Sequence, residues 1–135
     1  MKIYDIAVVG AGAAGIMASI RAAQLKKNVV LVERNNSIGK KILITGKSRC
    51  NVTNIAPIST FIEKFGKQGP FFRSAFSTFF NHDLMDFFKF KGLELKVERQ
   101  GRVFPTTDNA YSIVEVLRKY LSDNNVTILY KMRLT

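Results

Sequence analysis

Cysteine and histidine are almost absent from this chain of 135 residues. Cys50 is the single cysteine, so no disulfide can form within the chain, which is typical of a protein from the reducing cytoplasm. His82 is the single histidine, and its place beside Asp83 in an aromatic segment favours an exposed or capping side chain over a catalytic one. We expect no metal site, and the sequence assigns no catalytic residue.

The chain also lacks an apolar run that is long enough to cross a membrane. Residues 6–19 are small and apolar, but they are fewer than the roughly 20 residues that a transmembrane helix needs. A buried strand followed by a helix explains this run better, and we expect no membrane span.

Acidic residues are scarce as well. The chain has 21 Lys and Arg against 10 Asp and Glu, which gives a net charge of +11. Such a balance suits phosphate-bearing partners. The cations are spread from Lys2 to Arg133 instead of forming one cluster, so we expect a small-molecule substrate and no specific nucleic acid partner.

Three glycines near the N-terminus have the spacing of a dinucleotide-binding turn. Gly10, Gly12 and Gly15 form G-x-G-x-x-G between an apolar run and a helical pattern. In such a turn Gly10 permits the sharp bend, Gly12 lets backbone N–H groups approach a pyrophosphate, and Gly15 lets the helix pack closely on the strand. The helix N-terminus adds unpaired N–H donors and a positive dipole end.

The segments around the glycines support this interpretation. An apolar strand precedes them, a helical pattern follows, and Val29–Val32 forms a second buried strand that ends at Glu33. Residues 3–33 therefore have about the 30-residue length of a βαβ unit, with an acid roughly 20 positions beyond the glycines. Glu33 is expected to accept hydrogen bonds from the ribose of an adenosine. The pattern does not separate NAD from FAD, which share the ADP half, and Arg34 keeps NADP open.

A basic loop at residues 34–54 follows the second strand. Gly46-Lys47-Ser48 is similar to the end of a P-loop, but that motif needs a glycine where this chain has Lys41, so a nucleotide triphosphatase is not expected. A solvated loop without a role is the alternative on spacing alone. We expect the loop to lie along the far half of an extended dinucleotide through backbone N–H groups and through Thr45, Lys47, Arg49, Asn51 and Asn54.

Residues 55–105 are rich in phenylalanine and are predicted to be an insertion between sheet elements. All eleven phenylalanines lie between Phe61 and Phe104, and their spacing predicts a helix over residues 73–91 that buries an aromatic face and stops at Gly92. Residues 93–98 alternate apolar and charged side chains, as in a strand with one wet face. Thr107 or Asp108 is expected to cap a helix, and residues 126–130 form the last predicted strand.

These patterns predict a three-layer α/β fold, in which a Rossmann-like parallel sheet with flanking helices carries a mixed, Phe-rich insertion. The βαβ unit at residues 3–33 and the helix and strand at residues 108–131 build the sheet. A complete doubly wound domain has about six strands, so we interpret residues 1–135 as the N-terminal part of such a domain.

At the basic loop the sequence resembles a known family. The segments Gly10–Gly15, Glu33-Arg34, Gly39–Lys41, Ile44–Asn54 and Gly101–Pro105 together resemble the BaiN/YhiN-type bacterial flavoproteins, which include aminoacetone oxidase. The resemblance implies an FAD-dependent oxidoreductase of the two-dinucleotide-binding-domain class that is considerably longer than this chain. It also implies that residues 1–135 belong to the FAD-binding domain and that the substrate domain is absent.

The resemblance further implies which residues contact FAD. Reduced flavin carries negative charge near N1 and the C2 carbonyl, so Lys47 and Arg49 are candidates to stabilise it. Cys50, beside these cations, is either a redox thiol with a lowered pKa or, as we favour, a loop cysteine held for packing. The implied contacts are Gly12, Ala13, Ala14, Glu33, Arg34, Lys40, Lys41, Thr45 and Gly46, with Arg49-Cys50-Asn51 toward the flavin, and Gly10, Gly15 and Asn54 complete the expected site.

The sequence thus predicts the FAD-binding portion of a cytoplasmic oxidoreductase that passes hydride between a small-molecule donor or NAD(P)H and an acceptor. One alternative is an NAD-binding domain of a dehydrogenase or regulator, and another is a basic nucleic-acid-binding module without redox turnover. We expect the 135-residue chain alone to be inactive, because it keeps only part of the surface that would enclose FAD.

Overall fold

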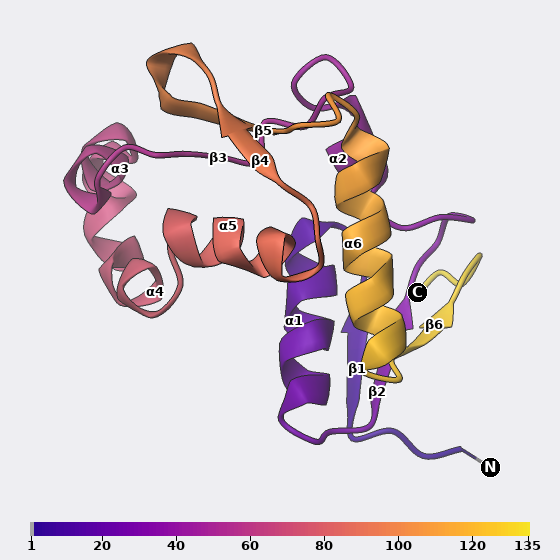
Figure 1. The fold of residues 1–135 in the computed structure, drawn as a ribbon. Coiled ribbons are helices and arrows are strands. Elements are labelled where there is room, and N and C mark those ends of the chain that lie inside the picture. The colour runs from indigo at the N-terminus through magenta and orange to yellow at the C-terminus, as the bar shows by residue number, and fades with distance from the viewer. Residues whose placement is uncertain (1) are drawn as a thin grey trace.

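Six strands and the helices between them make up the fold of residues 2–135, which the computed structural model describes (Figure 1). The chain order is β1 (Ile6–Val9), α1 (Ala13–Gln24), β2 (Val29–Val32), α2 (Lys40–Ile44), β3 (Thr53–Asn54), α3 (Ile58–Lys64), the 3-10 helix η1 (Gly66–Phe72), α4 (Arg73–Thr78), α5 (Asn81–Phe90), β4 (Leu95–Val97), the 3-10 helix η2 (Arg99–Gly101), β5 (Arg102–Pro105), α6 (Ala110–Asp123) and β6 (Thr127–Leu129).

A parallel sheet of order β1-β2-β6 forms the base of the fold, as predicted. Ile6 is in register with Val29 and Val9 with Val32, while Val30 is in register with Thr127 on the other side of β2. Residues 3–33 therefore form the expected βαβ unit. The Rossmann-like fold class predicted from the sequence is confirmed.

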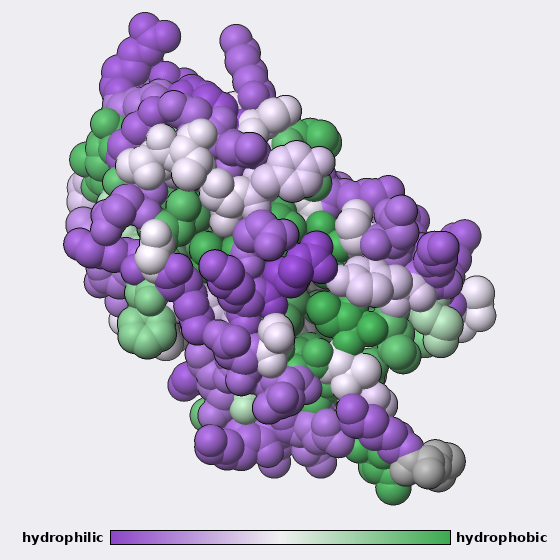
Figure 2. Space-filling view, turned by 45° about the vertical axis from the view of Figure 1, so that its right-hand side comes forward, coloured by the Kyte–Doolittle hydropathy of each residue, from purple (hydrophilic) through white to green (hydrophobic). Residues whose placement is uncertain are grey.

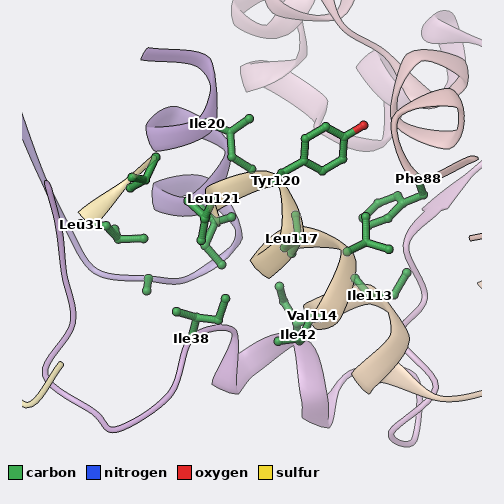
Figure 3. Packing of buried hydrophobic residues seen from close by; sticks show 14 of the residues in the cluster. Ile20, Leu31, Ile38, Ile42, Phe88, Ile113, Val114, Leu117, Tyr120 and Leu121 are labelled. Carbon is green, nitrogen blue, oxygen red and sulfur yellow. The ribbon is translucent and has the colours of Figure 1, made fainter. Parts of the chain in front are cut away.

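The core lies between this sheet and the helices α1 and α6, which Figure 1 shows side by side. Ile16, Ile20, Leu31 and Leu121 are at most 2% exposed. Figure 3 shows Leu117 and Leu121 of α6 within the same cluster as Ile20 and Leu31. Each such side chain contributes roughly 1.5–3 kcal/mol by leaving water.

The opposite face of the sheet is partly open. Val9 of β1 is 57% exposed and Leu129 of β6 is 37% exposed. Ala7, two residues before Val9 in β1, is exposed as well. We expected β1 to be buried on both faces in a three-layer fold, but residues 2–135 form two layers, because α1 and α6 pack on the same side. Figure 2 shows several groups of hydrophobic residues at the surface, of which the largest lies right of the centre of the view.

A second, antiparallel sheet of order β3-β5-β4 joins the end of the basic loop to two strands of the insertion and lies at the top of Figure 1. Thr53 pairs with Val103, and Leu95 pairs with Pro105. The predicted strand with one wet face is wrong at its end, because Val97 of the apolar face is 48% exposed while Lys96 and Glu98 are only partly exposed. This sheet holds the end of the basic loop against β5.

The predicted helix over residues 73–91 is wrong in one respect, because it is two helices. The chain is extended at Phe79 (φ −151°, ψ 115°) and Phe80 (φ −128°, ψ −163°), and α5 begins at Asn81. The Asp83 carboxylate accepts the Phe80 N–H at 2.7 Å and so caps the second helix. The break lets Phe80 pack edge-on against Phe61, with ring centroids 4.9 Å apart, instead of continuing the aromatic stripe.

Two local predictions near the basic loop also need correction. Residues 40–44, expected as part of a loop, form the short helix α2, which begins after Gly39 in the left-handed conformation (φ 69°). The helix α6 is capped by Asn109 instead of Thr107 or Asp108, because the Asn109 side chain accepts the Tyr111 N–H at 2.9 Å.

Candidate dinucleotide-binding site

The glycine turn joins β1 to α1 with the geometry that its spacing predicts. Gly10 has a φ of +96° and its N–H donates to the Val32 carbonyl at 2.8 Å. A Cβ at Gly15 would lie 2.0 Å from the Gly10 carbonyl oxygen, so only glycine permits this approach of helix and strand. A Cβ at Gly12 would have no atom within 4 Å, so it would project into open space at the helix N-terminus.

The N-terminus of α1 has no side-chain cap. Gly12 occupies the N-cap position in an extended conformation and offers no side chain to the first N–H groups of the helix. These donors and the positive end of the helix dipole are what a pyrophosphate binds.

Glu33 lies at the end of β2, next to the glycine turn, and is only 7% exposed. Its Oε2 accepts the Ala11 N–H at 2.7 Å, and its Oε1 accepts the Asn35 backbone N–H at 2.8 Å and the Asn35 side-chain amide at 2.6 Å. Burial alone would raise the pKa of this carboxyl, but the hydrogen bonds from Asn35 and Ala11, together with Arg34, lower it. Glu33 is therefore held as a carboxylate, with lone pairs remaining to accept hydroxyl donors.

A cavity of about 540 Å³ opens above these groups, and we call it the adenosine cavity. Its cations are Arg34, Lys40, Lys41 and Arg133, and Glu33 is the one acid among its lining residues. The other lining residues are Val9, Gly10, Ala11, Gly12, Val32, Asn35, Ser37, Met132 and Leu134. The cavity thus combines an ordered carboxylate with a cationic rim.

A second cavity of about 350 Å³ lies on the other side of Gly12, and we call it the apolar cavity. It shares Gly12 and Lys41 with the adenosine cavity. Its remaining lining residues are Ala13, Met17, Ile42, Thr45, Cys50, Asn51, Val52, Leu84, Phe88, Ile113 and Leu117. The two cavities meet at the N-terminus of α1, as the two halves of a dinucleotide would.

The two cavities bring together ten of the sixteen residues predicted to bind a cofactor. Gly15 instead serves the packing of α1 on β1, and Ala14 is exposed in the first turn of α1. The Asn54 side chain donates to the Gln100 carbonyl at 2.7 Å and accepts the Ala56 N–H at 2.8 Å, so it is engaged in holding the insertion. The predicted residues that line neither cavity are Ala14, Gly15, Gly46, Lys47, Arg49 and Asn54.

Arg49 is bound to two carboxylates. Its guanidinium donates to Glu98 at 2.8 Å and to Asp108 at 3.1 Å, and its Cζ lies 4.1 Å from the centre of the Phe104 ring. These hydrogen bonds raise the pKa of Arg49 and lower those of Glu98 and Asp108. The charge that we predicted to stabilise reduced flavin is largely balanced here, and the role of Arg49 toward flavin stays a prediction.

Cys50 is buried at the edge of the apolar cavity. Burial raises the pKa of its thiol, and a hydrogen bond with Thr45 only partly offsets that effect. The lowered pKa expected of a redox thiol is therefore not found, and the role of Cys50 as a loop cysteine held for packing stays a prediction.

Sequence reasoning missed one wall of the adenosine cavity. Met132, Arg133 and Leu134 follow β6 and line it, and the N–H groups of Lys131 and Met132 donate to the carbonyls of Asn35 and Glu33, both at 3.0 Å. The rule that ligands bind beyond the carboxyl ends of parallel strands would have found this segment, because β6 lies next to β2.

The hydrogen bonds of Glu33 predict a pH-dependent stability. Because its pKa is lowered in the folded chain, its contribution should be full above the unfolded pKa of about 4.3 and be lost as the pH falls through the folded value. At pH 7, Glu33→Gln should lower the free energy of unfolding by about 1–2 kcal/mol, because one acceptor oxygen would become an NH2 group that faces the Ala11 or the Asn35 donors. Urea unfolding from pH 7 to pH 3 should show this difference shrinking.

Glu94→Gln is the matched control for that experiment, since Glu94 is exposed. A Glu33→Gln penalty that stays constant down to pH 3 would contradict the hydrogen-bonded carboxylate.

Residues 2–135 contain neither a membrane-spanning helix nor a cluster of metal ligands. No helix in this range is long and apolar enough to cross a membrane. The same residues hold no group of three or more His, Cys, Asp or Glu side chains placed to bind a metal ion.

Comparisons with known proteins find relatives of this chain. The chain is 36% identical over 130 residues to the 3-dehydro-bile acid delta(4,6)-reductase of Clostridium scindens, a match that covers 95% of this chain and 31% of the relative. It is 33% identical over 130 residues to the ribosomal RNA dihydrouridine synthase of Escherichia coli, covering 94% of this chain and 31% of that protein. The chain thus spans about a third of the length of these relatives.

The fold has a solved counterpart in the crystal structure of Thermovibrio ammonificans THI4. The TM-score is 0.59 at 16% identity, and the match covers 94% of this chain and 38% of that one. The family model described as the HI0933-like protein Rossmann domain matches residues 4–135. The chain therefore belongs to the HI0933-like Rossmann domain family, which confirms the resemblance to the BaiN/YhiN-type flavoproteins found in its motifs.

Proposed function

We propose that this chain is the FAD-binding part of a flavin-dependent oxidoreductase. The observation that carries this proposal is the meeting of two cavities at Gly12, one with the Glu33 carboxylate and a cationic rim, the other mostly apolar. The family membership and a relative named as a reductase support the same conclusion.

The residues present fit FAD. The open space where a Cβ at Gly12 would lie leaves room for a pyrophosphate against the α1 N-terminus, and Lys41 lines both cavities at that point. Glu33 would accept the ribose hydroxyls, and the Met132–Leu134 segment would cover the adenine. Thr45, Cys50 and Asn51 would lie toward the flavin half, as the resemblance implies.

The chain's own residues would bind and orient the cofactor. When bound, FAD supplies hydride and electron transfer, which no side chain provides. Arg34 and Lys40 would neutralise the pyrophosphate charge, while Leu84, Phe88 and Leu117 would keep water from the apolar cavity. We propose that the hydride passes between a small-molecule donor or NAD(P)H and an acceptor.

RNA is a second candidate for the substrate of the whole protein. The relative from Escherichia coli is named as a ribosomal RNA dihydrouridine synthase, and so is one from Haemophilus influenzae. The net charge of +11 would attract a polyanion. The sequence predicts a small-molecule substrate instead, and the relative named as a 3-dehydro-bile acid reductase supports that prediction.

Calorimetric titration of the chain with ADP, FAD and NADH tests the proposal. ADP and FAD should compete for one site, and FAD should bind at least about 10-fold more tightly, because its flavin half gains the contacts of the apolar cavity. Affinities should still be modest, since residues 1–135 form only part of the expected enclosure. Binding of NADH in clear preference to FAD would favour the dehydrogenase alternative instead.

A further inference from the structure

A third cavity, of about 550 Å³, lies between α2 and the N-terminus of α6, and we call it the α2–α6 cavity. It shares Lys40 and Lys41 with the adenosine cavity but none of its other lining residues. The remaining lining residues are Leu43, Ile44, Ser48, Asn109 and Tyr111. A dinucleotide that occupies the adenosine and apolar cavities would leave this space free.

The charge of the α2–α6 cavity is positive, since it is lined by two lysines and no acid. Lys40 reaches toward the adenosine cavity, where its Nζ donates to the Asn35 side chain at 3.1 Å. Lys41 lines all three cavities, and no carboxylate within residues 2–135 forms an ion pair with it. An anion in the α2–α6 cavity would therefore find Lys41 available.

Two large apolar groups stand exposed at this cationic surface. Ile44 is 75% exposed and Tyr111 is 63% exposed, although each carries a side chain that gains free energy by leaving water. A ring and a branched aliphatic chain beside two cations suit a ligand with a flat ring and a negative charge.

One lining residue of this cavity, Ser48, lies in a strained turn. Gly46, Lys47 and Ser48 have successive φ values of 55°, 56° and 64°, and the left-handed region is costly for residues with a Cβ. The Ser48 carbonyl accepts the Ala110 N–H at 2.9 Å, which ties this turn to the start of α6. Strain that the surrounding structure maintains is common where a ligand is bound.

We propose that the α2–α6 cavity binds a second nucleotide, with its phosphate at Lys41 and its ring against Tyr111 and Ile44. The inference rests on the proposed function in one respect, because it assigns the adenosine cavity to FAD. A phosphate with an attached ring occurs both in a nicotinamide dinucleotide that donates electrons and in a nucleotide of an RNA substrate. Lys41, which lines all three cavities, would hold either ligand beside the adenosine and apolar cavities.

Titration of the ADP-saturated chain with NADPH and with a labelled oligouridine tests this site. At least one of the two should bind without displacing ADP. Tyr111→Ala should weaken that binding at least about 10-fold and leave the ADP affinity within about twofold, because Tyr111 lines only the α2–α6 cavity. Phe90→Ala, which removes an 81% exposed ring on α5, is the matched control and should change neither affinity.

The outcomes separate the two proposals. NADPH binding beside ADP identifies an electron donor site, and oligouridine binding alone identifies an RNA site. One-for-one displacement of ADP by both probes, or an unchanged affinity in Tyr111→Ala, overturns the second site. If ADP does not bind, the proposed function fails, and the Tyr111 dependence of probe binding without ADP still decides the second site.

Discussion

Gly12→Val should weaken FAD and ADP binding at least 100-fold, a loss of about 3 kcal/mol, and leave the fold intact. Gly12 has φ −84° and ψ −177°, a conformation that valine adopts readily, and a Cβ there would meet no atom within 4 Å. The branched side chain would instead fill the space in front of the α1 N-terminus. A pyrophosphate would then be unable to reach the helix N–H groups.

Isothermal titration with ADP, together with urea unfolding, measures both halves of this prediction. Ala18→Val is the matched control, because it makes a similar change at an exposed position farther along α1. It should cost only the lower helix propensity of valine, about 0.5 kcal/mol, and leave ADP binding unchanged. Wild-type affinity in Gly12→Val would mean that the turn serves the fold alone.

The parallel half of the fold was predictable because its signals are local and agree with one another. Buried parallel strands show as continuous apolar runs, as in Val29–Val32, and the glycine spacing marks the turn between β1 and α1. Glu33 directly follows β2, so the length of the βαβ unit predicts that Glu33 lies beside the glycine turn. The prediction was wrong for the second face of β1, which is partly exposed, because periodicity does not reveal whether a helix covers a strand.

The insertion was less predictable because its order depends on contacts between distant residues. Phenylalanine spacing alone favours one long helix and does not reveal that Phe79 and Phe80 are extended. The break depends on Asp83 capping Phe80 and on the contact of Phe80 with Phe61, nineteen positions earlier. Tertiary packing overrides helix propensity in such a segment.

In the candidate site too, the residues placed by local signals were predictable and those placed by distant contacts were not. Residues near the glycines and Glu33 fall into the cavities as predicted, because strand ends place them. Arg49 does not, since its partners Glu98 and Asp108 lie about fifty and sixty positions away and no local pattern reveals them. The Met132–Leu134 wall needed the strand order, which places β6 beside β2.

Gly15→Ala should do the reverse of Gly12→Val and destabilise the fold. The added Cβ would lie 2.0 Å from the Gly10 carbonyl oxygen and 3.4 Å from Cγ1 of Val8. The oxygen belongs to the backbone of the glycine turn, so α1 must move away from β1 to relieve the clash. We expect the free energy of unfolding to fall by about 3 kcal/mol, near the upper end for overpacking, even though alanine favours a helix over glycine.

Urea unfolding of Gly15→Ala and Gly12→Ala gives a matched comparison within the same turn. Both replace hydrogen by methyl, but only the Cβ at position 15 meets backbone, so Gly12→Ala should stay within about 0.5 kcal/mol of the wild type. The movement of α1 would also shift the N–H groups that face the adenosine cavity, so Gly15→Ala that remains folded should bind ADP more weakly. Equal stability of the two variants would show that α1 is not held against β1 as closely as Gly15 requires.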